Sequence, residues 1–230
     1  MRGLLIVLAL LLSPAAQAGP WPRPAGELYV FTGHQGGGEG WSGLYAEYGL
    51  PRDLTLGLDL GGHVVGLPAY FYTGYADRQV DGRVRAFVRA PVPMPRSAPR
   101  WAEHWRAAVE VGIGRDFLDD GGRVDRFGIG ASLGRGFETP LGDGWTTLDW
   151  RAAFAGAAET RTNLGLVLGL KPHPRIAVEL AAFVERETET SWQIGPTMQL
   201  SVGRLGDLRF GVAQSSEDGT ELVAGWALTF

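Results

Sequence analysis

The stretch from Leu54 to Leu60 reads Leu-Thr-Leu-Gly-Leu-Asp-Leu, so every second residue is a leucine and the residues between are small or polar. Successive side chains of an extended chain point to opposite faces. The stretch therefore predicts a strand with one apolar face and one small, polar face. No helical period is sustained anywhere after residue 18.

The same alternation returns along the chain, for example over Leu164–Leu170. Hairpin and alternation rules predict about twelve strands. They are expected near residues 27–34, 41–50, 54–63, 80–90, 105–115, 126–136, 145–155, 161–171, 174–185, 191–203, 206–214 and 220–230. The segment from Ala69 to Tyr75 shows the alternation least clearly, so a miscount is easiest there. The predicted fold class is all-β, an antiparallel up-and-down barrel.

The first eighteen residues predict an export signal. Arg2 supplies a basic start, Leu4–Leu12 form an apolar run, and Ala16-Gln17-Ala18 is a cleavage pattern. This order is typical of a secretory signal peptide, and the run is too short for a membrane span. A retained membrane anchor is the alternative. We therefore expect a signal peptide over 1–18 and a single barrel domain over 19–230.

Composition excludes several classes of protein. The chain has no cysteine, which rules out a disulfide-stapled fold, a thiolate metal site and a lipid-anchored lipoprotein. Its net charge of -4 argues against nucleic acid as a partner. No later segment approaches eighteen apolar residues, so a helical membrane protein is excluded as well.

Alternation alone allows a soluble barrel with its apolar face inward or a membrane barrel with that face outward. Small residues on the polar face of 126–136 favour the membrane barrel, because they suit a crowded, concave interior. Aromatic residues on the apolar face gather near strand ends and predict two membrane girdles. The expected girdle residues are Tyr48, Trp105 and Phe230 at the periplasmic rim, and Phe127, Phe154 and Trp192 at the outer rim. Trp150 and Trp226 fall deeper.

The connections and the C-terminus point the same way. Tight turns such as Pro51-Arg52-Asp53 alternate with looser, glycine-rich or acidic loops, as in outer-membrane barrels. The Pro-rich segment from Pro91 to His104 breaks this rule. An even strand count places both termini in the periplasm. Phe230 ends the chain on the apolar face, which resembles the terminal signal that the barrel assembly machinery recognises. We expect a monomer in outer-membrane lipid.

One hairpin carries a family resemblance. Residues 44–50 read LYAEYGL, and LTLG follows at 54–57 after a short turn. This hairpin is similar to one in the uncharacterised, transporter-like barrels filed under the meta-pathway of phenol degradation. The resemblance covers that hairpin, the overall size and the terminal strand. It implies a pore or uptake role for small molecules and carries over no functional residue.

The polar face also holds charged residues that a closed barrel would bring together in its lumen. The lumen candidates are Arg83, Arg85, Arg89, Arg106, Glu110, Asp149, Arg151, Glu179 and Arg209. One interpretation is a plug of salt bridges, because buried charges must pair. The other is a selectivity lining, in which the arginine row favours anionic solutes.

Three functions remain open on these residues. The first is a pore or transporter for small solutes, and the second is a structural or anchoring barrel with a plugged lumen, accessory to surface-polymer export. The third is an outer-membrane hydrolase, which needs a serine beside a histidine base. None of the four histidines has a serine two positions later, so we predict no enzyme. No metal site or cofactor is expected, since the acidic loops lack the spacing of a calcium loop.

Overall fold

A computed structural model describes residues 19–36, 40–63, 81–93, 102–118, 120–156 and 158–230. The expected signal peptide and the segment from Ala69 to Tyr75 lie outside these residues. In the described part of the chain, no helix is both long and apolar enough to cross a membrane.

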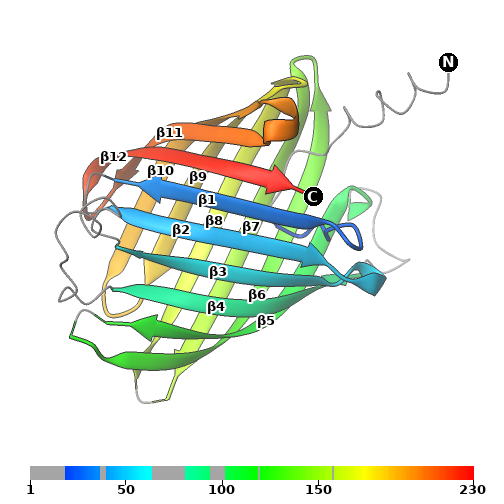
Figure 1. The fold of residues 1–230 in the computed structure, drawn as a ribbon. Coiled ribbons are helices and arrows are strands. Elements are labelled where there is room, and N and C mark those ends of the chain that lie inside the picture. The colour runs from blue at the N-terminus through cyan, green and yellow to red at the C-terminus, as the bar shows by residue number, and fades with distance from the viewer. Residues whose placement is uncertain (1–18, 37–39, 64–80, 94–101, 119, 157) are drawn as a thin grey trace.

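The described residues form twelve antiparallel strands that close into one barrel (Figure 1). The strands are β1 (Leu28–Gln35), β2 (Trp41–Gly49), β3 (Thr55–His63), β4 (Gly82–Val92), β5 (Trp105–Phe117), β6 (Arg123–Thr139), β7 (Gly142–Ala155), β8 (Ala158–His173), β9 (Ile176–Arg186), β10 (Thr190–Ser201), β11 (Asp207–Ser215) and β12 (Gly219–Thr229). Each strand pairs with its neighbours in sequence, and β1 pairs with β12. The predicted all-β, up-and-down barrel of twelve strands is confirmed.

The barrel closes through the two ends of the chain. Tyr29 lies opposite Thr229 in the β1–β12 ladder. Beyond the strand, Leu28 N donates to Phe230 O at 3.1 Å and Phe230 N donates to Leu28 O at 2.9 Å. We call this end of the barrel, which also carries the β2–β3, β6–β7, β8–β9 and β10–β11 turns, the terminal end. The opposite end is called the loop end.

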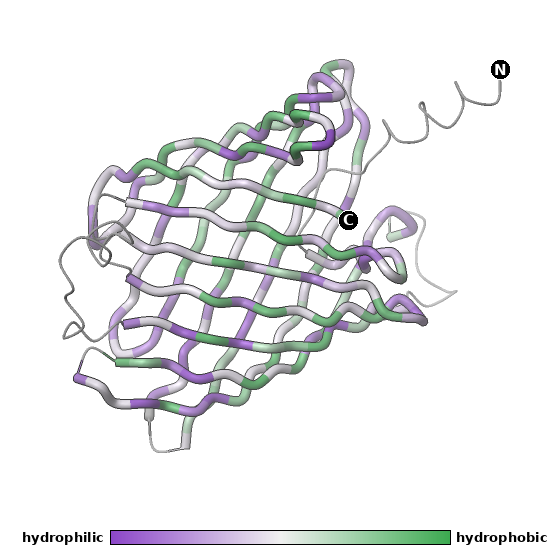
Figure 2. Tube along the Cα trace, viewed as in Figure 1, coloured by the Kyte–Doolittle hydropathy of each residue, from purple (hydrophilic) through white to green (hydrophobic). Residues whose placement is uncertain are grey.

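The apolar face of the strands points outward. On β8 the side chain of Leu166 is 49 % exposed, and on β5 that of Val111 is 54 % exposed. Their neighbours on the other face, Gly165 and Glu110, are buried. Figure 2 shows the alternation as short hydrophobic and hydrophilic segments that follow one another along the strands. The barrel thus presents apolar side chains to its surroundings and encloses the polar ones.

Five strands, β4 to β8, extend two or more residues past their predicted bounds at one or both ends. β6 begins at Arg123, and Asp125 forms an ion pair with Arg115 of β5 at 2.6 Å. This extension carries charges in place of the apolar alternation, so the pattern could not reveal it. β8 begins three residues earlier than predicted, and β4 includes Pro91 and Val92, which we had assigned to a connection. The rest of that connection lies mostly outside the described residues.

Candidate functional site

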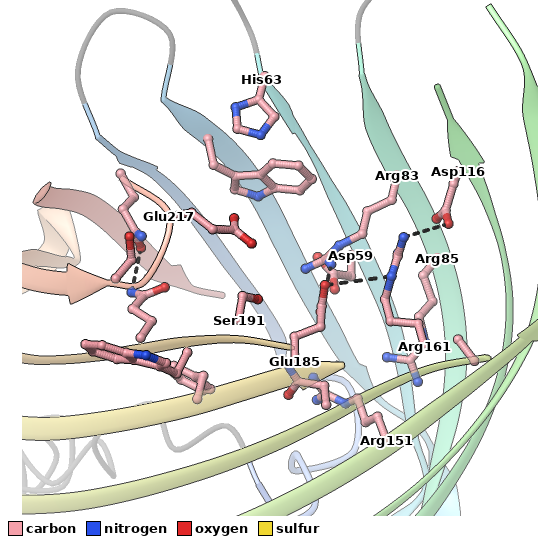
Figure 3. Close-up of a pocket in the computed structure, with 18 of the residues that line it drawn as sticks. Asp59, His63, Arg83, Arg85, Asp116, Arg151, Arg161, Glu185, Ser191 and Glu217 are labelled. Carbon is pink, nitrogen blue, oxygen red and sulfur yellow. Dashed lines mark hydrogen bonds and ion pairs between the residues drawn. The ribbon is translucent and has the colours of Figure 1, made fainter. Parts of the chain in front are cut away.

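A cavity of about 1030 Å³ opens at the loop end of the barrel. We call it the vestibule. It lies among Gln35 at the end of β1, Ser215 and Glu221 beside the β11–β12 turn, and the inward residues of β3–β8. Figure 3 shows Arg83, Arg85, Arg151 and Arg161 on one side of the vestibule, whereas Ser191 and Glu217 lie on the other. The vestibule is therefore polar, and its arginine side also holds the carboxylates of Asp59, Asp116 and Glu185.

The arginine side of the vestibule is held by ion pairs between strands. Arg126 Nε lies 2.5 Å from Asp116 Oδ2 and pairs also with Glu187. Arg161 Nη2 lies 3.2 Å from the same Asp116 oxygen and 2.8 Å from Glu187 Oε2. Arg83 is more loosely placed, 3.8 Å from Glu185. These contacts fix the directions of the arginine side chains that border the cavity.

A denser set of charges lies below the vestibule, toward the terminal end. Arg89 is only 2 % exposed and Glu47 only 1 % exposed. Arg89 Nη1 donates to Glu47 Oε1 at 2.7 Å, and Arg89 Nη2 donates to Glu110 Oε2 at 3.1 Å. Tyr45 OH donates to Glu47 Oε1 at 2.6 Å. This arrangement satisfies the buried charges by ion pairs and hydrogen bonds together, as burial requires.

Glu110 holds further arginines in the same place. Arg151 Nε donates to Glu110 Oε1 at 3.0 Å, and Arg85 pairs with the same oxygen. Arg85 and Arg89 each lie over the ring of Phe87, about 5 Å from its centroid. The buried charge cluster consists of Arg23, Glu47, Arg85, Arg89, Glu110 and Arg151. Its four arginines outnumber its two glutamates, and Glu27 also pairs with Arg23 at 3.6 Å, which leaves an excess of one positive charge.

The remaining lumen candidates lie apart from this cluster. Glu179 and Arg209 form their own pair at 2.5 Å. Asp149 accepts a hydrogen bond from Ser132 Oγ. Arg106 is exposed at the start of β5 and donates to the carbonyl of Glu103. Of the nine predicted lumen residues, Arg83, Arg85 and Arg151 border the vestibule.

Sequence reasoning missed several residues of the site. Arg126 and Arg161 are the first residues of two predicted strands, 126–136 and 161–171. Neither was predicted to lie in the lumen. Glu47 and Tyr45 lie two residues apart on the polar face of β2, which was a usable signal. Arg23 precedes the first strand and had no pattern to indicate that it enters the barrel.

The aromatic residues of the predicted girdles lie on the outer surface. Tyr48, Phe127, Phe154, Trp192 and Phe230 are exposed, and Trp105 is half-buried. Phe127 lies directly opposite Phe154 in the β6–β7 ladder.

Trp226 had been placed deep in the apolar band. Its indole Nε1 donates to Leu205 O at 2.6 Å, in the β10–β11 turn at the terminal end. The side chain reaches this end because β11 begins only at Asp207, opposite Ala227. A residue three positions from the end of β12 therefore lies beside a turn.

One histidine and serine meet across two strands. His34 of β1 lies opposite Ser42 of β2, and His34 Nδ1 is 2.9 Å from Ser42 Oγ. This pair does not match the expected pattern of a serine two residues after a histidine on one strand, because its members are eight residues apart in the sequence. Both side chains lie on the outward face of the barrel near the loop end.

Solved structures share this fold. The KdgM porin is 8 % identical to the chain with a TM-score of 0.60, over 88 % of this chain and 99 % of KdgM. KdgM has also been solved in complex with disordered oligogalacturonate, at a TM-score of 0.59. The NanC porin is 9 % identical, with a TM-score of 0.54 over 87 % of this chain and 97 % of NanC. At such identities the likeness is one of fold.

Comparison with known protein families finds no match, and comparison with curated proteins finds none either. The resemblance to the phenol-degradation barrels therefore stays a prediction.

Proposed function

We propose that the chain is an outer-membrane barrel with its terminal end in the periplasm and its loop end outside the cell. The exposed leucines and valines of β5 and β8 support this location, because hydrocarbon accepts them and water does not. Closure of β1 on β12 supports it too, since an open sheet edge in lipid would leave backbone groups unsatisfied. Recovery of the protein in the soluble periplasmic fraction would contradict this placement.

The function that the geometry supports best is a porin that admits small polar solutes. The observation that carries this proposal is the vestibule, a cavity of about 1030 Å³ inside a closed barrel that has an apolar exterior. Its volume suits a small molecule. Purified protein should give discrete conductance steps in planar bilayers and should release small solutes from liposomes. Complete absence of both would refute the proposal.

We propose further that an anionic group of the solute lies toward Arg83, Arg85 and Arg151. The excess of positive charge in the buried charge cluster just below supports this orientation. Glu217 and Glu221 border the opposite wall, and Asp59, Asp116 and Glu185 lie among the arginines, so we expect only a small anion preference.

The test replaces Arg83, Arg85 and Arg151 with glutamine and measures the reversal potential across a salt gradient. The anion-to-cation permeability ratio should fall by about twofold or more, because the variant removes fixed cations beside the path. Arg115→Gln is the control, since Arg115 is exposed and pairs with Asp125 away from the vestibule. An unchanged ratio in the triple variant would disprove the selectivity role.

The second candidate is a structural barrel with a closed lumen. The buried charge cluster favours it, because Arg89 and Glu47 are almost inaccessible and fill the lumen below the vestibule. This candidate predicts no conductance steps under any condition, even when residues 19–24 leave the lumen.

A lipid hydrolase has one geometric support, the contact between His34 and Ser42. A serine beside a base can attack an ester carbonyl. We expect no phospholipid turnover by the purified protein. Phospholipid turnover that is lost in Ser42→Ala would support the hydrolase.

A further inference from the structure

The residues just before β1 begin inside the barrel. Gly19 and Pro20 are buried and Arg23 is 8 % exposed, whereas Pro24 is exposed. We call residues 19–24 the N-terminal segment. It lies at the terminal end and contributes Arg23 to the buried charge cluster.

Polar contacts join this segment to several strands. Arg89 Nη1 of β4 donates to Gly19 O at 3.1 Å. Arg23 N donates to Thr55 Oγ1 of β3 at 3.2 Å, and Arg23 Nε lies 2.6 Å from Glu47 Oε2 of β2. The segment thus uses groups of the lumen wall as its hydrogen-bond partners.

The wall is also shaped to receive the segment. A Cβ atom on Gly134 of β6 would come within 2.7 Å of Pro20 Cγ and 2.6 Å of Trp21 Cη2. A Cβ atom on Gly49 of β2 would lie 1.9 Å from Pro24 O. A side chain at Gly49 would collide with the backbone of the segment, and one at Gly134 would require the Pro20 and Trp21 side chains to shift, so glycine provides the recess in which the segment lies.

The segment crosses the lumen and does not follow a single strand. It contacts Glu47 on β2 and Gly134 on β6. Strands β3, β4 and β5 lie between these two strands in the barrel wall. Inward side chains elsewhere around the terminal half are buried as well, including Tyr29, Trp145 and Ala227. Together they leave the terminal half filled and the loop half hollow.

We propose that the terminal end of the barrel is a binding site for the chain's own N-terminal segment, which acts as a removable plug beneath the vestibule. This proposal rests on the proposed porin function, because a plug has meaning only for a lumen that conducts. Arg23 Nη2 is buried without a hydrogen-bond partner, and an unsatisfied donor weakens binding. The proposal requires that the segment exchange between a bound and a released position, although Arg23 also pairs with Glu27 and Glu47.

A disulfide can hold the plug in place. The double variant Pro20→Cys with Gly134→Cys brings two thiols together, and the natural sequence contains no other cysteine. The mature chain is refolded, oxidised or reduced, and measured in planar bilayers. The single variant Gly134→Cys is the control, because it makes the same change in the wall and cannot form a disulfide within the chain.

The reduced double variant should conduct, with an open probability about tenfold or more above that of the oxidised form, because oxidation removes the released state. Reduction should leave Gly134→Cys unchanged. A chain that lacks residues 20–24 should conduct at least as well as the reduced variant. If the oxidised and reduced forms both conduct and do so equally, the plug is refuted and the porin proposal stands.

A second measurement separates the two proposals. Maleimide labelling of Pro20→Cys reports directly whether the segment leaves its site. Labelling of the reduced form without conductance in any variant would refute the porin and retain the binding site. Absence of both labelling and conductance would refute the removable plug.

Discussion

At the scale of single residues, the glycines of the polar face make room for aromatic rings. A Cβ atom on Gly57 would lie 2.0 Å from Phe87 Cζ, and one on Gly169 would lie 2.0 Å from Trp145 Cε2. Small residues were expected on the inner face because a barrel interior is concave. The structure gives a more specific reason, which is that rings from neighbouring strands lie across these positions and exclude a side chain.

Gly57→Ala should therefore destabilise the barrel by about 1–3 kcal/mol, because the added methyl group forces Phe87 out of its place. Urea titration of the refolded protein measures the change. Gly43→Ala is the matched control on the same face of neighbouring β2, where the nearest atom to a new Cβ would be 3.4 Å away. Equal losses in the two variants would show that overpacking against Phe87 is not the cause.

Charge pairing gives a second prediction at this scale. Glu110→Gln removes the anion that three arginines share and should cost about 3–5 kcal/mol, because it leaves buried cations without compensation. Asp125→Asn breaks the exposed pair with Arg115 and should leave the unfolding midpoint unchanged. A barrel that tolerates both changes alike would mean that the buried charge cluster contributes little to stability.

At the scale of strands, the apolar face is a continuous outer surface. Leucines at alternate positions of β8 lie beside apolar residues of β7 and β9, for example Leu166 beside Leu148 and Ala182. Such a surface is expected to match the hydrocarbon layer over the middle of each strand. The charged extension of β6 from Arg123 to Asp125 lies beyond it.

If the outer face contacts lipid, Leu166→Arg should destabilise the barrel by about 2–4 kcal/mol, because it places a charge at the middle of that face. Leu141→Arg makes the same change in the β6–β7 turn, where Leu141 is 69 % exposed, and should cost about 0–1 kcal/mol. Unfolding in lipid vesicles provides the comparison. Similar values at the two sites would argue that the outer face does not contact lipid.

The last strand has a role beyond its apolar face. The backbone of Phe230 closes the barrel against Leu28, whereas its side chain is exposed. Phe230→Ala keeps the backbone bonds and should refold normally in vitro. Its yield in the outer membrane of cells should fall severalfold if the ring is a signal for the assembly machinery. An unchanged yield would remove that role.

At the scale of the whole molecule, the lumen is divided into a hollow loop half and a filled terminal half. The vestibule lies in the first, and the buried charge cluster with the N-terminal segment lies in the second. The two interpretations of the lumen charges, a salt-bridge plug and a selectivity lining, therefore apply to different depths of one barrel. Arg85 and Arg151 belong to both, since each borders the vestibule and pairs with Glu110.

The N-terminal segment leads to a prediction about processing. If the signal peptide ends at Ala18, the mature protein begins with Gly19, whose carbonyl oxygen binds Arg89. Intact mass of the protein from the outer membrane should therefore correspond to residues 19–230. A mass that includes residues 1–18 would identify a retained anchor.

The sequence alone determined the number, order and pairing of the strands. Its period-two alternation assigns every residue of a strand to one of two faces, and hairpin connections then leave little choice of topology. The same pattern placed Arg83, Arg85, Arg89 and Glu110 on one face. It is a local property, so each strand could be read without its neighbours.

Only the tertiary structure decided which way the faces point and which charges meet. Glu47 and Arg89 are 42 residues apart, and their contact depends on how adjacent strands are aligned around a closed ring. The entry of residues 19–24 into the lumen was equally invisible, because an irregular segment has no period to indicate its place. Closure of the barrel brings distant polar groups into one interior, and the sequence records none of those distances.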